Sequence, residues 1–186
     1  GPRGRAPPSA ETLLTYPQPV LSAEAEEAPQ VSAQWPGEAG TWQTVAMMRN
    51  MARESSLHPW IRDRAAQVTA HCERNTRCQC LALYGYVKNV LPYVKDPEGV
   101  EALHHPVTWI ERRLREGKPV YGDCDDASMY LAALLLAIGH RPRFRVLGRE
   151  DRLHHVSVVC HNIFLDTTVQ PGVQYPQPKR ALQVPV

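Results

Sequence analysis

The order of two hydrophobic periodicities constrains the fold of this chain more than any other sequence feature. Up to residue 138 the apolar residues recur at helical spacing, and after that they alternate with polar residues. The alternation is clear in RFRVLG (143–148) and in LHHVSVVCHNIFLDTTV (153–169), where residues 161–162 fit a tight turn between two strands. Helices followed by an antiparallel sheet predict an α+β domain.

Several segments before the sheet are predicted to be helical. The strongest prediction covers Asp126 to Ile138, because its apolar run is followed by Gly139, a residue typical of the position after a helix C-terminus. The other predicted helices are TWQTVAMMRNMARESS (41–56), HPWIRDRAAQVTAHC (58–72), CLALYGYVKNVL (80–91) and TWIERRLREGK (108–118).

The first 40 residues differ from the rest in composition. Residues 1–40 contain seven prolines, and five glutamates stand against two arginines. Apolar residues in this segment have no sustained period, which favours an extended arm over a packed domain. We therefore predict an arm at 1–40, one domain at 41–175 and a C-terminal tail at 176–186.

Length and charge limit the classes of function. A chain of 186 residues suffices for one domain with a core. A net charge of +2 does not favour nucleic acid or an anionic membrane as a partner. The longest apolar run, Met129 to Ile138, is shorter than the roughly 20 residues that span a bilayer, and no signal peptide is visible. We expect a soluble protein.

The chain has five cysteines, an odd number, and it is large enough to form a stable core without disulfides. Reduced thiols are therefore the default expectation. The segment HCERNTRCQC (71–80) places Cys72, Cys78 and Cys80 near His71, and such a set could bind zinc. The spacing is not that of a zinc finger, and in a helix Cys78 and Cys80 would point to different sides. Ordinary thiols are favoured, with no metal or cofactor; a metal-stabilised module remains an alternative.

Cys124 stands at the predicted start of the strongest helix, in the sequence GDCDD (122–126). Free N–H groups at a helix N-terminus favour an anion, and a cysteine there releases its proton more easily. Asp123, Asp125 and Asp126 act against this, although one of them is expected to cap the helix. A lowered pKa of the thiol would therefore require a cationic partner, for which histidine is the usual residue.

His155 and Asp166 are the residues predicted to complete a site with Cys124. A turn at 161–162 sets His155 opposite Thr168, and a turn at 160–161 sets it opposite Asp166; both put His155 and Asp166 on one sheet face. A carboxylate beside an imidazole fixes its tautomer, as in a nucleophile–base–orienter triad. The alternative is a buried cysteine, a surface histidine and a strand-end aspartate without a common role.

Four sequence segments together resemble a known family. GDCDDASMYLAALLLAIGHRPRFRV, HHVSVV, FLDTT and, upstream, YGYVKNVLPYVKDPEGVEALHHP are similar to the transglutaminase-like family of papain-type fold, in the branch often encoded by bacteriophages and prophages. The resemblance covers about residues 60–170. It implies that Cys124 is the nucleophile, His155 the general base and acid, and Asp166 the orienting carboxylate.

The resemblance also implies a reaction, which is acyl transfer at an amide of a protein or peptide substrate. Water as the acceptor would make the protein a protease or amidase, and an amine would make it a transglutaminase. The backbone N–H of Cys124 is the expected oxyanion donor, with Trp109, Tyr121 and Gln79 as further candidates. The implied location is a virion or the host cytoplasm. The alternative is a structural virion or assembly protein, tethered to its partner by residues 1–40.

Overall fold

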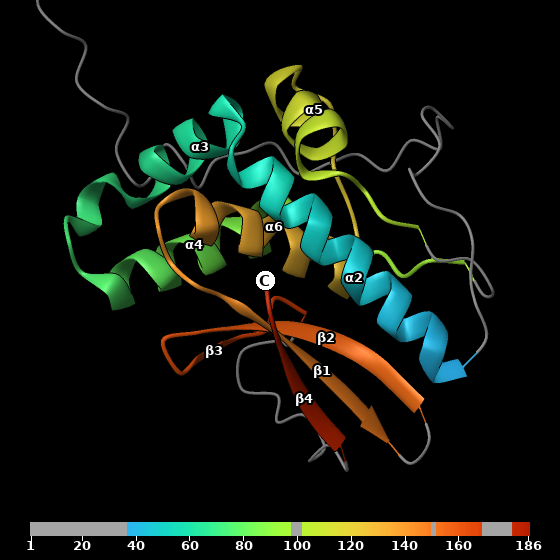
Figure 1. The fold of residues 1–186 in the computed structure, drawn as a ribbon. Helices are drawn as coiled ribbons and strands as arrows, with labels where there is room; N and C mark the ends of the chain where they lie inside the picture. The colour runs from blue at the N-terminus through green and yellow to red at the C-terminus, as the bar shows by residue number, and fades with distance from the viewer. Residues whose placement is uncertain (1–36, 98–101, 150–151, 169–179) are drawn as a thin grey trace, which may run out of the picture.

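The helices gather on one side of a four-stranded antiparallel sheet, which makes the protein an α+β fold (Figure 1). The computed structural model describes residues 37–97, 102–149, 152–168 and 180–186. In chain order the elements are α2 (Gly37–Ser56), α3 (Pro59–Thr69), the short 3-10 helix η1 (Ala70–Cys72), α4 (Thr76–Val90), the π-helix η2 (Pro106–Glu111), α5 (Arg112–Arg115), α6 (Cys124–Ala137), β1 (Arg143–Arg149), β2 (Arg152–Cys160), β3 (Ile163–Leu165) and β4 (Arg180–Pro185).

The helix ends follow from local sequence. The side chain of Asn75 caps α4 by accepting from the N–H of Cys78 at 2.9 Å, and Pro59 occupies the first turn of α3. Gly139, after the end of α6, has a φ of +90°. Helix α2 begins at Gly37, within the segment predicted to be an arm, and residues 1–36 lie outside the described residues.

The strands lie in the order β3-β2-β1-β4. In the β2–β3 hairpin, Cys160 pairs with Ile163 and Val158 with Leu165, so the turn is at 161–162. Both turn residues have positive φ, 49° at His161 and 61° at Asn162, as a two-residue hairpin turn requires. The first of the two predicted registers is thus the one observed.

The segment predicted to be a C-terminal tail contributes strand β4 to the sheet. It pairs antiparallel with β1, with Phe144 opposite Val184 and Arg143 opposite Pro185. Its sequence signal is weak, because an edge strand leaves residues such as Ala181 and Gln183 exposed and Pro185 is at home only at a strand edge or end.

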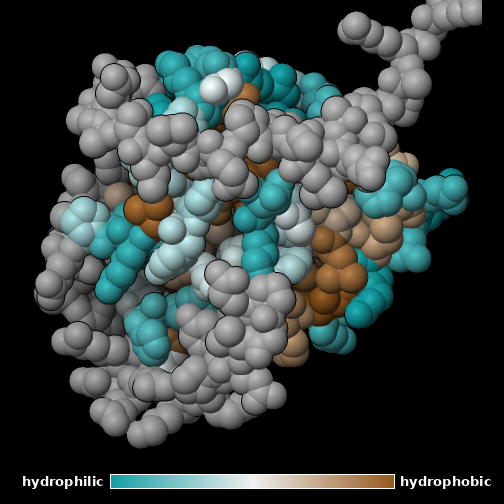
Figure 2. Space-filling view, turned by 180° about the vertical axis from the view of Figure 1, so that it is seen from behind, coloured by the Kyte–Doolittle hydropathy of each residue, from teal (hydrophilic) through white to brown (hydrophobic). Residues whose placement is uncertain are grey.

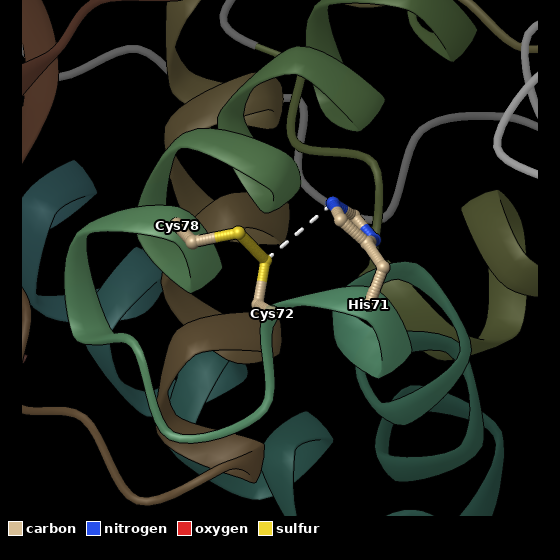
Figure 3. Close-up of side chains that lie close together, drawn as sticks. All are labelled: His71, Cys72 and Cys78. Carbon is tan, nitrogen blue, oxygen red and sulfur yellow. Dashed lines mark hydrogen bonds between the residues drawn. A yellow bond between two sulfur atoms is a disulfide. The ribbon is translucent and has the colours of Figure 1, made fainter.

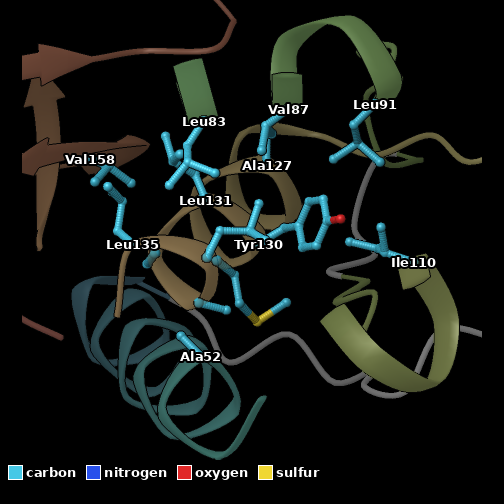
Figure 4. Packing of buried hydrophobic residues seen from close by; sticks show 14 of the residues in the cluster. Ala52, Leu83, Val87, Leu91, Ile110, Ala127, Tyr130, Leu131, Leu135 and Val158 are labelled. Carbon is cyan, nitrogen blue, oxygen red and sulfur yellow. The ribbon is translucent and has the colours of Figure 1, made fainter. Parts of the chain in front are cut away.

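Helix α6 is the centre of the hydrophobic core. Every residue from Asp126 to Leu135 is buried, because α2, α3 and α4 surround the helix and β2 lies against it. Figure 4 shows Tyr130, Leu131 and Leu135 of α6 among side chains from α2, α4, η2 and β2. This all-round burial explains the uninterrupted apolar run and fixes the position of the residue that begins the helix, Cys124.

A buried ionic network joins α3, η2 and α6. Glu111 is fully buried, and its carboxylate accepts from Arg64 at 3.0 and 3.2 Å and from the hydroxyl of Tyr130 at 2.6 Å. Arg115 lies 3.4 Å from the second oxygen. A buried carboxylate requires such partners.

Within the described part of the chain, no helix is long and apolar enough to cross a membrane. Seen from behind, the surface has many hydrophilic residues and one hydrophobic area on the right (Figure 2). This side corresponds to the left of Figure 1, where α4 and β3 lie.

Candidate active site

A capping box organises the N-terminus of α6. One oxygen of Asp123 accepts from the backbone N–H groups of Asp125 at 2.9 Å and Asp126 at 3.4 Å. In return, the carboxylate of Asp126 accepts from the N–H of Asp123 at 3.2 Å. The expectation that an aspartate caps this helix is therefore confirmed, and Asp123 and Asp126 both take part in the capping box.

The chain before Cys124 is held by pairing with a second segment. The N–H of Val94 donates to the carbonyl of Gly122 at 2.8 Å, and the N–H of Gly122 donates to the carbonyl of Pro92 at 3.2 Å. A Cβ at Gly122 would stand 2.6 Å from both Cβ and an oxygen of Asp126. Glycine is thus required here by close packing against the capping box.

A second histidine–aspartate pair, His104 and Asp126, lies at the first turn of α6, and the sequence pattern did not predict it. His104 donates to Asp126 through its backbone N–H at 2.6 Å, and its Nδ1 lies 2.8 Å from the other carboxylate oxygen. Both residues are buried, and the ring of Trp109 stacks on that of His104 with centroids 3.9 Å apart. Asp126 therefore ties the loop before η2 to α6, instead of facing a substrate.

Cys124 is the first residue of α6 and is partly buried. Its Sγ lies 3.5 Å from Oδ1 of Asp125. Burial raises the pKa of the thiol well above its usual value, and the charges of Asp125 and Asp123 raise it further. The backbone N–H of Val156 acts in the opposite direction. The helix terminus alone therefore does not lower the pKa of Cys124 enough to favour a thiolate at neutral pH.

Helix α6 lies along the edge of β2 that faces away from β1. Ser128, one turn after Cys124, donates to the carbonyl of Val156 at 3.2 Å, and the N–H of Val156 points to the sulfur of Cys124. Pairing with β3 covers only Val158 to Cys160 on that edge. The nucleophile candidate thus contacts the backbone of the residue directly after His155.

The structure brings His155 and Asp166 together. Nε2 of His155 lies 2.6 Å from Oδ2 of Asp166, and His155 is buried. His154, the neighbouring residue, is exposed, as the alternation of strand side chains predicted. The other oxygen of Asp166 accepts from the N–H of Thr168 at 3.1 Å and from its hydroxyl at 2.8 Å.

The hydrogen bonds to Asp166 keep it ionised. Burial acts to raise the pKa of this carboxyl, but donation from His155 and Thr168 outweighs burial, so the net pKa lies below the usual value. Tyr84 of α4 also donates to the backbone carbonyl of Asp166 at 3.2 Å. Asp166 is therefore an anchored anion that can orient His155 and stabilise its charged form.

Asp123 behaves in the opposite way. Burial and the charges of Asp126 and Asp96 raise its pKa to about 7, although its hydrogen bonds to backbone N–H groups lower it in part. Near neutral pH this carboxyl is therefore protonated in some molecules and ionised in the others. Its charge state alters the field at Cys124, which follows it in the chain.

Of the side chains predicted as oxyanion donors, Trp109 and Tyr121 lie around His104 near the N-terminus of α6, and Gln79 does not. The ring of Trp109 contacts that of Tyr121 with centroids 5.3 Å apart, and Nε1 of Trp109 is buried with no hydrogen-bond partner among the described residues. Gln79 instead donates to the carbonyl of Glu73 at 2.7 Å and contacts His140 at 2.9 Å. Gln79 is therefore engaged in another part of the molecule.

The cysteines near residue 75 correct the expectation that all thiols are reduced. Cys72 and Cys78 form a disulfide, and Nε2 of His71 lies 3.5 Å from the sulfur of Cys72 (Figure 3). Cys80 is on another side of α4, where it is buried next to Cys160. The three thiols therefore do not converge on a metal, because two are bonded to each other and the third faces the core.

No family model, curated protein or solved structure matches this chain. The geometry of the described residues is thus the basis on which a function is proposed.

Proposed function

We propose that the protein is a cysteine-dependent acyltransferase or hydrolase acting at an amide, with Cys124 as nucleophile, His155 as general base and acid, and Asp166 as orienting carboxylate. The observation that carries this proposal is the 2.6 Å contact between Nε2 of His155 and a carboxylate that Thr168 anchors through two further hydrogen bonds. A buried imidazole on an anchored anion is the arrangement of a catalytic base.

In the proposed reaction, His155 exchanges protons through Nδ1, because Nε2 faces Asp166. The S–H proton of Cys124 passes to His155 as the sulfur attacks the amide carbonyl carbon. Collapse of the tetrahedral intermediate breaks the C–N bond, and the departing amine takes the proton from His155. Water or an amine, deprotonated by His155, then attacks the thioester and releases Cys124 as a thiol.

The raised pKa of Cys124 restricts how this reaction starts. Because burial and the neighbouring acids raise the pKa of the thiol, its deprotonation must be coupled to attack, and a nearby imidazole that becomes charged favours it. The backbone N–H of Cys124, at the first turn of α6, is the proposed oxyanion donor, and the buried indole N–H of Trp109 is a second candidate.

The raised pKa of Cys124 also favours a second function. A thiol kept neutral by burial and two acids also suits a protein that retains the fold for binding. In this alternative the chain is a structural virion or assembly protein whose partner is bound by residues 1–40. The phage setting and the papain-like fold belong to the proposal and follow from the resemblance of the sequence.

An acylation assay with p-nitrophenyl acetate, a generic acyl donor, distinguishes the two functions. The enzyme predicts a burst of p-nitrophenol and an acetyl group on Cys124 by peptide mass spectrometry, both absent in Cys124→Ala and strongly reduced in His155→Ala. Adding a primary amine then reports whether the thioester passes to water or to the amine. Acetylation of Cys124 that is equal in the wild type and in His155→Ala would contradict the enzyme and favour the binding protein.

A further inference from the structure

Two histidines meet at the far end of the β2–β3 hairpin from His155. Nδ1 of His140, which follows α6, lies 3.1 Å from Nε2 of His161, the first turn residue. The ligand atoms of His140, His161 and Cys160 all lie within 4.8 Å of one another. Cys160 is buried, His140 partly buried and His161 exposed, so the group lies at the surface with the sulfur beneath the two rings.

The protonation of His140 is fixed by a neighbour. Gln79 donates through its amide nitrogen to the carbonyl of Glu73 at 2.7 Å, which turns its amide oxygen towards Nε2 of His140, 2.9 Å away. An amide oxygen only accepts, so Nε2 of His140 carries the proton and Nδ1 presents a lone pair to His161. Metal-binding histidines typically donate their second N–H to a carbonyl in this way.

The surroundings of Cys160 bear on its use as a ligand. Cys80 of α4 is buried, and its sulfur and that of Cys160 share a hydrogen bond. The backbone N–H of Arg141 also points to the sulfur of Cys160, where it would stabilise a thiolate. Two imidazoles and one thiol thus converge from the residue after the α6 C-terminal glycine and from the hairpin, while Cys80 lies next to Cys160 and outside this group.

We propose that His140, His161 and Cys160 bind a zinc ion, with its fourth position open to water. Tetrahedral zinc with nitrogen ligands at about 2.0–2.1 Å holds two such atoms about 3.3 Å apart, close to the 3.1 Å found here. Imidazole and thiolate ligands in tetrahedral geometry are typical of zinc. On binding, the thiol of Cys160 loses its proton to solvent, and neutral His161 keeps its proton on Nδ1. The site pins the segment after α6 to the hairpin that carries His155 and Asp166.

The test uses the full chain without a histidine tag. The protein is reduced, incubated with zinc and freed of excess metal, and bound zinc is then measured by elemental analysis. We expect a single zinc ion per chain, and cobalt in its place should give thiolate-to-cobalt charge-transfer bands. His161→Asn is the sharpest variant, since asparagine tolerates the left-handed turn conformation but removes the ligand. It should abolish stoichiometric binding while circular dichroism stays unchanged.

Two further variants distinguish this site from zinc held by His71, Cys72 and Cys78. Gln79→Ala should weaken zinc binding by about 10- to 100-fold, because it removes only the partner of His140. The double variant Cys72→Ser/Cys78→Ser should bind zinc as the wild type does, since those residues lie in the other cluster. Absence of zinc from the reduced protein, binding retained by His161→Asn, or a Cys80–Cys160 disulfide that persists in the reduced sample would overturn the proposal.

Discussion

Asp166 holds His155 from a position eleven residues along the chain, and Nε2 of the histidine and Oδ2 of the aspartate are 2.6 Å apart. The β2–β3 turn at 161–162 creates this relationship, because it returns the chain so that both side chains share a sheet face. On the other side, α6 delivers Cys124 to the backbone of Val156. The candidate triad thus depends on one hairpin and one helix terminus.

Replacing Asp166 by asparagine should reduce acylation of Cys124 without unfolding the protein. Asparagine has the same shape but cannot stabilise a charged His155, and a misaligned or wrongly protonated general base costs about 10²- to 10⁴-fold in rate. The rate of p-nitrophenol release measures the effect. Asp63→Asn, at an exposed position of α3, is the matched control and should leave the rate unchanged. A rate within twofold of wild type in Asp166→Asn would argue against the orienting role.

Much of this arrangement could be predicted from the sequence because it depends on local periods. The alternation in 153–160 and the turn residues 161–162 determine the hairpin, and the apolar run after Asp126 determines α6. The His104–Asp126 pair was missed, because it joins segments 22 residues apart through a loop that has no regular period. The Cys80–Cys160 contact was missed because it joins α4 and β2, two regular elements far apart in the chain whose packing the local sequence pattern does not specify.

Removing a charge next to Cys124 should make the thiol more reactive. Asp125 is the strongest electrostatic contributor to the raised pKa of Cys124, and its carboxylate lies 3.5 Å from the sulfur. Asp125→Asn should therefore lower the pKa and increase alkylation by iodoacetamide at neutral pH by about 3- to 10-fold, since one pKa unit is tenfold in thiolate. Peptide mapping after brief labelling gives the rate, and an unchanged rate would count against this electrostatic account.

Asp123 predicts an unusual dependence of stability on pH. Its pKa is about 7 in the folded protein and 3.8 in an ordinary environment. Between about pH 4 and 7 the folded state therefore keeps a proton that the unfolded state has released, so this residue's contribution to stability falls as the pH rises. Asp123→Asn retains an N-cap and removes the titration. Urea unfolding should show the variant gaining stability over wild type from pH 4 to 7; a constant difference would refute the assignment.

The contact between Gly122 and the capping box predicts a paired result for two glycine variants. Gly122→Ala places a Cβ 2.6 Å from Asp126 and should cost about 1–3 kcal/mol of unfolding free energy. Gly85→Ala, inside α4, meets nothing within 4 Å and should stabilise the protein by about 0.5–1 kcal/mol. Denaturant unfolding measures both. Equal effects of the two substitutions would show that the packing at Gly122 is not as described.

The buried network around Glu111 predicts that removing one charged partner lowers the unfolding free energy more than replacing both partners. Glu111→Ala leaves Arg64 without its carboxylate and should destabilise the protein by about 3–5 kcal/mol. Replacing both with apolar residues, Arg64→Met and Glu111→Leu, should cost less than the single change, because no buried charge is left unpaired. Unfolding free energies of the single and double variants decide this, and a double variant that is less stable than Glu111→Ala would contradict it.

The most direct test of the catalytic account is the rate at which iodoacetamide alkylates Cys124, measured from pH 5 to 9 in wild type, His155→Ala and His154→Ala. His154 is the matched control because it is the neighbouring histidine, exposed where His155 is buried. The account predicts that His155→Ala slows the reaction several-fold near neutral pH and that His154→Ala does not. Identical profiles for all three proteins would contradict the claim that His155 activates Cys124, and would leave the fold as a binding scaffold.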